Sequence, residues 1–349
     1  MRLHTDFTGG NLRVVSADGD SYRVEPELRD TTGDWFYWAF CVEGTAGRTL
    51  TFDFSPHAWV GPFGPAVSRD LRHWNWLYAG SPSRFSYTFT DDAPVYFAHD
   101  LLYHPDRFAD LAAELSLPIS KLCSSERRRD VPCARFGSGE ASIVLTARHH
   151  CCEATGNYVL EGILRELAAF PIPGYEIFAV PFVDYDGVLD GDQGKNRFPH
   201  DHNRDYLDSP LYASVRAVQE YERTHTVRFL YDLHSPWHCG GSNDHVFIVR
   251  SGGEQYALQA RFGQLLEEVL PQDAMHYRKA NDLEPETGWN LAASMNGSCR
   301  SYASRLPGIK LALTLETTYF GEPDHVVTQQ NLVSLGRAFA EVMRRMAAE

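Results

Sequence analysis

The fold of this chain is decided by the stretch Ser142-Ile143-Val144-Leu145-Thr146-Ala147-Arg148-His149-His150-Cys151-Cys152-Glu153. Its first half is a β-branched, apolar run of the kind that forms an interior strand of a parallel sheet. Beyond it, apolar residues recur at helical spacing, at Val159, Leu160, Ile163, Leu164 and Leu167. The turn between the expected strand and helix holds an imidazole and a carboxylate, His150 and Glu153. Such a pair can converge on one metal ion when the turn places the two side chains together.

Downstream of this stretch, strand-like and helical patterns alternate along the chain. Strands are expected at 142–148, 175–183, 227–234, 244–250 and 310–319. Helices are expected at 155–169, 210–224, 254–269 and 327–347. This alternation predicts an α/β layered sheet with helices on both faces. Functional sites in such folds lie beyond the carboxyl ends of the strands.

The first hundred residues have a different, all-β pattern. Short strands are expected at 11–15, 35–40, 48–52, 60–62 and 84–89, and their spacing predicts an antiparallel β-sandwich. Phe85, Tyr87 and Phe89 alternate and should share one face, as sandwich core. Residues 104–138 are interpreted as a helix followed by a solvated linker at Glu126–Asp130. The chain is therefore divided into a β-sandwich domain at 1–105 and an α/β domain at 106–349.

The composition indicates a globular, acidic protein and argues against some classes of partner. The chain has 349 residues, 43% of them hydrophobic and 22% charged, as expected of a globular protein. Its net charge of −14 argues against nucleic acid and anionic membranes as partners. Seven cysteines without regular spacing indicate a reducing compartment. Without a signal-peptide pattern or an apolar run of about 18 residues, we expect a cytoplasmic location. No pattern specifies the oligomeric state.

Three more groups of chemically useful residues fall near expected strand ends. His234 ends one strand, and Asp232 points to the same side and can hold the second ring nitrogen of a metal-binding His. Glu316 follows a hydrophobic strand, where a carboxylate can serve as a general base beside an activated water. A loop rich in Gly and Pro carries Arg197 and the pair Asn203-Arg204, which suit binding of a carboxylate or a polarised carbonyl.

In this order, the motifs resemble the zinc metallocarboxypeptidase family, and its cytosolic branch in particular. The stretch 147–153 is similar to that branch's A-R-x-H-P-G-E, 183–188 to N-P-D-G-V, and 314–318 to T-L-E-S-S. The β-rich N-terminal region resembles the sandwich domain that precedes the catalytic domain in that branch. The resemblance implies a carboxypeptidase-like α/β/α domain with a mixed, mainly parallel sheet. The chain departs from the family where Cys151-Cys152 replaces Pro-Gly.

The resemblance also implies a site. One zinc ion per chain would be held by His150, Glu153 and His234. Glu316 would act as general base, and Arg197 would stabilise the oxyanion.

The remaining roles concern the substrate and the metal's surroundings. Asn203 and Arg204 would bind the terminal carboxylate of a peptide or protein substrate, and Asp232 would orient His234.

Substrate preference is open at this stage. Arg300, upstream of Glu316, is similar in placement to a basic residue that favours acidic terminal side chains in the cytosolic branch. It is equally interpretable as a structural Arg. The alternatives to a carboxypeptidase are an amidohydrolase of the same fold, acting on an N-acyl amino acid or another small amide, and a binding protein whose hydrolase domain is inactive.

Overall fold

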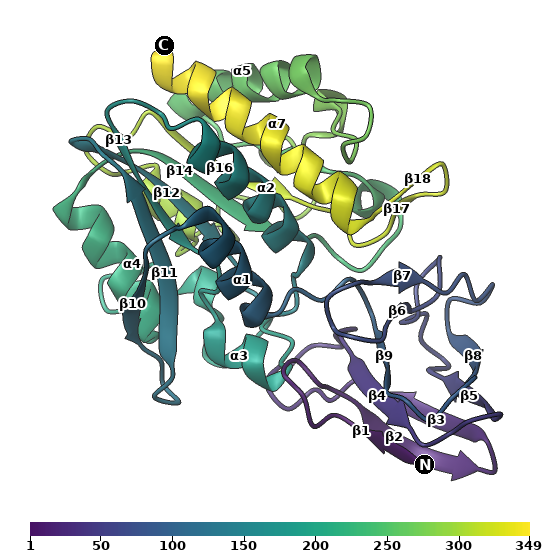
Figure 1. Cartoon of the computed structure of the whole chain (residues 1–349). Coiled ribbons are helices and arrows are strands. Elements are labelled where there is room, and N and C mark those ends of the chain that lie inside the picture. The colour runs from purple at the N-terminus through teal and green to yellow at the C-terminus, as the bar shows by residue number, and fades with distance from the viewer.

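The N-terminal third of the computed structural model, which describes residues 1–349, contains two β-sheets packed face to face (Figure 1). The five-stranded sheet has the order β1 (Arg2–His4), β4 (Ala39–Glu43), β9 (Val95–Ala98), β6 (Ala66–Ser68) and β7 (Asn75–Trp76). The four-stranded sheet has the order β2 (Arg13–Asp18), β3 (Ser21–Glu25), β5 (Thr49–Asp53) and β8 (Arg84–Thr88). All their pairings are antiparallel except that of β3 with β5, which is parallel.

The sandwich core is aromatic, as the alternating pattern predicts. Phe85 and Phe89 are buried and belong, with the half-buried Tyr87, to one hydrophobic cluster that joins the two sheets. Two expected strands differ from the structure. Residues 60–62 form turns, and the strand expected at 35–40 begins only at Ala39.

The second part of the chain is a seven-stranded mixed sheet. Its order is β10 (Ile119–Ser124), β11 (Asp130–Gly137), β13 (Tyr175–Val180), β12 (Ala141–Ala147), β14 (Thr226–His234), β16 (Leu311–Glu316) and β15 (Phe247–Val249). The four central strands, from β13 to β16, are parallel, whereas β10, β11 and β15 pair antiparallel at the edges. This confirms the predicted layered sheet, with central strands close to the expected bounds.

Helices cover both faces of this sheet (Figure 1). They are α1 (Pro105–Leu115), α2 (Thr155–Ala169), α3 (Tyr185–Asp190), α4 (Ala213–Thr224), α5 (Glu254–Val269), α6 (Cys299–Ala303) and α7 (Gln329–Ala348). A short hairpin of β17 (Gly321–Glu322) and β18 (His325–Val326) precedes α7. None of the helices combines the length and the apolar character that a membrane span requires.

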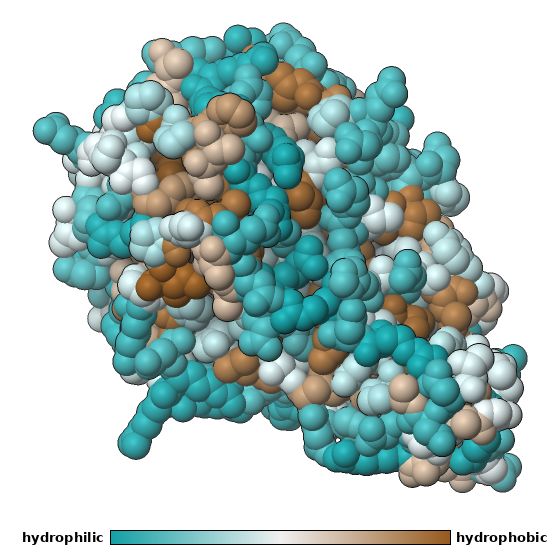
Figure 2. Space-filling model, viewed as in Figure 1, coloured by the Kyte–Doolittle hydropathy of each residue, from teal (hydrophilic) through white to brown (hydrophobic).

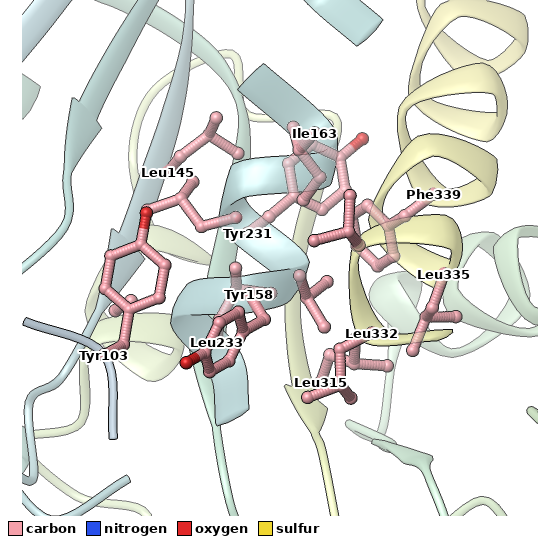
Figure 3. Close-up of a cluster of buried hydrophobic side chains, with 14 of the residues drawn as sticks. Tyr103, Leu145, Tyr158, Ile163, Tyr231, Leu233, Leu315, Leu332, Leu335 and Phe339 are labelled. Carbon is pink, nitrogen blue, oxygen red and sulfur yellow. The ribbon is translucent and has the colours of Figure 1, made fainter. Parts of the chain in front are cut away.

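The two faces of the central strands pack on different helices. Leu145 and Leu233 belong to the large core cluster with α2 and α7, and Val144 and Leu230 belong to the cluster with α4 and α6. Figure 3 shows the first cluster, with Leu145, Leu233 and Leu315 of the sheet facing residues of α2 and α7. Glycine permits the close approach of α2 and α7, because a Cβ on Gly162 would lie 2.1 Å from the carbonyl oxygen of Val333.

The segment Glu126–Asp130 is largely exposed, as expected, but its interpretation as a linker is wrong. The segment is the turn of the β10–β11 hairpin, and β11 pairs directly with β13. Arg129 forms ion pairs with Asp186 and Asp190 at 3.3 and 2.7 Å. The hairpin is hard to recognise from sequence because β10 is a polar, largely exposed edge strand.

The boundary at 105/106 stays a prediction. The separate sheets agree with it, but the largest core cluster is continuous across it, from Phe36 and Leu101 to Leu145. Figure 2 shows that the visible surface is mostly hydrophilic, with hydrophobic residues in small separate groups.

Candidate active site

Three parallel strands deliver the predicted residues to one edge of the sheet. His150 and Glu153 lie in the turn between β12 and α2, and β14 and β16 end at His234 and Glu316. The last two residues are direct partners in the register of β14 and β16. Because parallel strands end at the same edge, the four side chains meet although the sequence separates them widely.

The geometry of His150, Glu153 and His234 is that of a metal-ligand set. Nδ1 of His150 lies 2.8 Å from Oε1 of Glu153, and Nδ1 of His234 lies 2.7 Å from Oε2. One ligand atom from each residue lies within 4.8 Å of the others. Two imidazoles and one carboxylate are a typical donor set for a catalytic zinc ion, with further positions left open.

Carboxylates hold the outer nitrogen of both histidines. Oδ2 of Asp232 lies 2.9 Å from Nε2 of His234, and the Thr146 hydroxyl donates to the other Asp232 oxygen at 2.8 Å. Oδ1 of Asp201 lies 3.5 Å from Nε2 of His150. Such contacts fix the ring orientation and leave Nδ1 to face a metal. Burial opposes the charged form of His234, but the negative charges of Asp232 and Glu153 raise the pKa of His234 well above its usual value.

Glu316 lies beside this set but is not part of it. Its side chain is buried, its Oε2 has no hydrogen-bond partner, and it lines the cavity into which His150 and Glu153 project. Burial, assisted by the charge of Glu153, raises the pKa of Glu316 to about 7. A carboxylate with a pKa near neutrality is suited to accept and return a proton.

Two connected cavities meet at the ligand set. The outer cavity, of about 430 Å³, is open and includes Trp35, Lys195 and Trp237. The inner cavity is narrower and includes Asn203 and Arg300. Their shared lining residues are His150, Arg204, Trp289 and Glu316. A substrate therefore can have one end in the inner cavity and its scissile bond at Glu316.

No family model matches the chain. An uncharacterized protein of Zymomonas mobilis is 25% identical over 361 residues, which cover 93% of this chain and 89% of that protein. Among solved structures, a metallo-carboxypeptidase from Burkholderia cenocepacia matches with a TM-score of 0.80 and 17% identity over 99% of both chains. The chain has the metallocarboxypeptidase fold.

Other solved structures agree with this fold. A metallo-carboxypeptidase from Pseudomonas aeruginosa, in complex with (2-guanidinoethylmercapto)succinic acid, has a TM-score of 0.75 and 21% identity, covering 100% of this chain and 99% of that chain. Carboxypeptidase A from Helicoverpa armigera has a TM-score of 0.51 and 12% identity, covering 71% of this chain and 74% of that chain. The two bacterial metallo-carboxypeptidase structures therefore match this chain over its N-terminal sandwich as well as over its α/β part.

Within the metallocarboxypeptidase fold, Asn203 and Arg204 reach the site and Arg300 reaches the inner cavity. Asn203 lies on a short helical turn, with Nδ2 3.2 Å from Nε2 of His234 and Oδ1 accepting from the Cys299 amide at 3.0 Å. Arg204 donates to the Asn203 carbonyl at 2.8 Å and borders both cavities. The structure thus brings together all the predicted site residues except one.

The exception is Arg197, which was expected to stabilise the oxyanion. Its guanidinium forms ion pairs with Asp30, Asp184 and Asp192 at 3.0, 2.8 and 3.2 Å. It borders a different, acidic pocket, whose lining includes neither Glu316 nor any of the three metal-ligand residues. Three carboxylates, one of them from the N-terminal region, hold this arginine in a structural position. The structure therefore does not place Arg197 in the cavities at the metal-ligand set, and its oxyanion role stays a prediction that this geometry does not favour.

Lys195, two residues earlier in the same loop, is the cation that sequence reasoning missed. Its Nζ lies 2.6 Å from Oε1 of Glu153 and 3.3 Å from the Ser235 carbonyl. It also lies 4.9 Å from the centroid of the Trp35 ring, close enough for a cation–π contact. The loop has no periodicity from which the directions of Lys195 and Arg197 could be distinguished.

Cys151 and Cys152, which replace Pro-Gly, point away from the ligand set. The Cys151 thiol contacts the carbonyl of Asp192 at 2.9 Å, and Cys152 contacts the Tyr319 hydroxyl at 3.8 Å. Burial raises the pKa of the Cys152 thiol to about 12. Both thiols therefore pack as small, uncharged side chains.

Proposed function

We propose that this protein is a zinc-dependent carboxypeptidase that hydrolyses the C-terminal bond of peptides. The observation that carries the proposal is the convergence of His150, Glu153 and His234 beside the unpaired carboxylate of Glu316. This arrangement lies where a narrow cavity lined by Arg204 and Arg300 meets a wider one. The comparison structures support the proposal because two of them are described as metallo-carboxypeptidases.

His150, Glu153 and His234 fit a zinc ion, and we propose that they hold it. Both Nδ1 atoms already face the Glu153 carboxylate, and Asp201 and Asp232 occupy the opposite nitrogens. When bound, zinc supplies Lewis-acid chemistry, polarising a carbonyl and making water more acidic.

The chain's own residues provide the proton transfers and substrate binding. Glu316 accepts the proton of the attacking water and later returns it to the leaving amine. Arg204 binds the terminal carboxylate through a charge-assisted contact, and Asn203 adds an amide donor. Lys195 lies 2.6 Å from Glu153 and lines the outer cavity with Glu316, and we propose that it stabilises negative charge developing on the scissile carbonyl.

Lys195 and Arg197 are expected to behave differently when each is replaced by Met. Lys195→Met should lower kcat by about 10²- to 10³-fold, because it removes a cation from the reacting centre. Its melting temperature should fall less than that of Arg197→Met, because bound zinc would offset the charge of Glu153, with which Lys195 pairs at 2.6 Å. Arg197→Met should instead lower the free energy of unfolding by about 3–5 kcal/mol, because it leaves buried carboxylates uncompensated. Steady-state kinetics and thermal unfolding of both variants, at equal zinc content, test the assignment. A large loss of kcat in a stable Arg197→Met variant would restore the original assignment.

Arg300 supports a preference for an acidic terminal side chain. Arg300 is only 4% exposed, and its guanidinium donates to the Val249 carbonyl at 2.8 Å and to the Ser251 hydroxyl. Burial lowers the pKa of Arg300 to about 10, since no carboxylate forms an ion pair with it. A Glu or Asp side chain in the inner cavity would supply the missing negative charge.

Arg300→Met should therefore change specificity more than activity. We expect kcat/KM for a Glu-terminated peptide to fall about 30-fold or more, because the variant removes one partner of a buried charge pair. A Leu-terminated peptide should be cleaved no more slowly than by the wild type. Arg204→Met is the contrasting variant, since it should slow the hydrolysis of both peptides. Equal losses for both peptides in Arg300→Met would show that this arginine is structural.

A direct comparison of substrates separates the proposed function from the small-amide alternative. The zinc-loaded protein would be given acetyl-Ala-Glu and N-acetylglutamate, and released Glu would be measured. The carboxypeptidase proposal expects the peptide to be cleaved with the higher kcat/KM, because only the peptide extends into the outer cavity. Faster hydrolysis of N-acetylglutamate would favour the amidohydrolase.

A further inference from the structure

A loop of the N-terminal region reaches the outer cavity. Asp30 accepts hydrogen bonds from the amides of Gln193 and Gly194 at 2.9 and 2.8 Å, and the Thr32 amide donates to the Asn196 carbonyl at 3.1 Å. These contacts fix the loop against residues 193–197, next to the metal-ligand set. Trp35 follows directly in this loop and lines the outer cavity.

Trp35 and Trp237 form an aromatic wall. Their ring centroids are 4.9 Å apart at an interplanar angle of 60°, an edge-on arrangement. Trp237 follows the ligand His234 by three residues and packs on Phe36 at 5.1 Å. It is nevertheless 41% exposed, so a large indole surface faces the cavity opening. The wall thus combines one side chain of the N-terminal sandwich with one of the catalytic part.

The position of this wall fixes which part of a substrate meets it. The inner cavity holds Arg300 and Asn203 and suits the terminal residue, whose carboxylate Arg204 binds at the junction. The scissile bond then lies at Glu316. The remainder of the peptide must leave through the outer cavity, where the residue before the scissile bond lies beside Trp35 and Trp237.

We infer that the N-terminal region supplies part of the substrate site, and that Trp35 and Trp237 bind an aromatic side chain immediately before the scissile bond. This inference rests on the proposed carboxypeptidase function. An aromatic side chain that packs on such a wall is stabilised both by the apolar area that it buries and by its contacts with the indole rings. The lining of this cavity carries charges of both signs, with Lys195 and Arg204 beside Glu153, Asp201 and Glu316. An acidic side chain is therefore not attracted there overall, and it gains neither apolar burial nor ring contact on the indoles.

The test compares three substrates that differ only at this residue: acetyl-Phe-Glu, acetyl-Ala-Glu and acetyl-Glu-Glu. For the zinc-loaded wild type, we expect kcat/KM for the Phe peptide to exceed that for the Ala peptide by about tenfold, and the Glu peptide to be poorest. In Trp237→Ala the Phe/Ala ratio should fall to about 1–2, because the variant removes the ring on which the Phe side chain packs. Trp237→Leu, which keeps apolar contact with Phe36, provides the same measurement if the alanine variant does not fold.

Phe170→Ala is the matched control, since Phe170 is an exposed aromatic residue at the end of α2 and should leave the ratio unchanged. Equal kcat/KM for the Phe and Ala peptides, or a ratio unaffected by Trp237→Ala, would overturn the aromatic subsite while leaving the carboxypeptidase function intact. A preference for the Glu peptide would replace the aromatic subsite with an acidic one. Failure to release Glu from any of the three would overturn both proposals.

Discussion

Replacement of Glu316 by Gln is expected to lower kcat by about 10³-fold while leaving the zinc content unchanged. The substitution keeps the size of the side chain but removes the group that accepts the proton, and general acid–base catalysis contributes about 10²- to 10⁴-fold. Zinc should remain because the proposed ligands are His150, Glu153 and His234. The variant would be compared with wild type by initial rates and by metal analysis of the same samples.

Glu222→Gln provides the control for Glu316→Gln. Glu222 is also a buried carboxyl group whose two oxygens lack hydrogen-bond partners, but it lies on α4 and lines neither cavity. Its substitution should leave kcat near the wild-type value. If Glu316→Gln kept wild-type kcat, the general-base assignment would fail.

Replacement of His234 by Ala is expected to abolish stoichiometric zinc binding and, with it, activity. His234 supplies one of three proposed ligands, and its ring is fixed by Asp232 at 2.9 Å. A ligand that binds only the folded state stabilises it, by about 4 kcal/mol at a thousandfold excess over Kd. Zinc should therefore raise the melting temperature of the wild type but not of the variant. Removal of zinc from the wild type by a chelator should abolish its activity in the same way, and added zinc should restore that activity.

His238→Phe is the matched histidine control. His238 is a buried histidine four residues after His234, but it packs among aromatic rings. The centroid of its ring lies 5.0 Å from that of Phe36 and 5.3 Å from that of Phe320. A Phe ring suits that environment, so zinc content should not change. Full zinc stoichiometry in His234→Ala would exclude the proposed ligand set.

The meeting of His150, Glu153, His234 and Glu316 at one edge of the sheet could be predicted from sequence, because each lies at or just after the end of a mainly apolar strand. Their roles as ligands and base rest on the resemblance to metallocarboxypeptidases. Burial on both faces makes β12, β14 and β16 mainly apolar in sequence, and the carboxyl ends of parallel strands lie at the same edge of a sheet. The β10–β11 hairpin carries a weaker signal, since an exposed edge strand need not be hydrophobic.

Loop residues could not be assigned in the same way. The directions of Lys195 and Arg197 depend on Asp30 and Trp35, which are more than 150 residues away in sequence and contact the loop only after folding. Asp201 was missed for a related reason, since its contact with His150 depends on the short helical turn at His202–Arg204. Tertiary contacts, not local pattern, determine these positions.

The most direct test of the account is the rate at which the zinc-loaded protein releases acetyl-Phe, the product common to both substrates, from acetyl-Phe-Glu and from its C-terminally amidated form. The account predicts release from the free peptide and a rate at least about a hundredfold lower for the amide, because Arg204 then has no carboxylate to bind. The release should disappear on chelation and return with zinc. Equal cleavage of the amidated peptide would contradict the assignment of this site to the C-terminal residue.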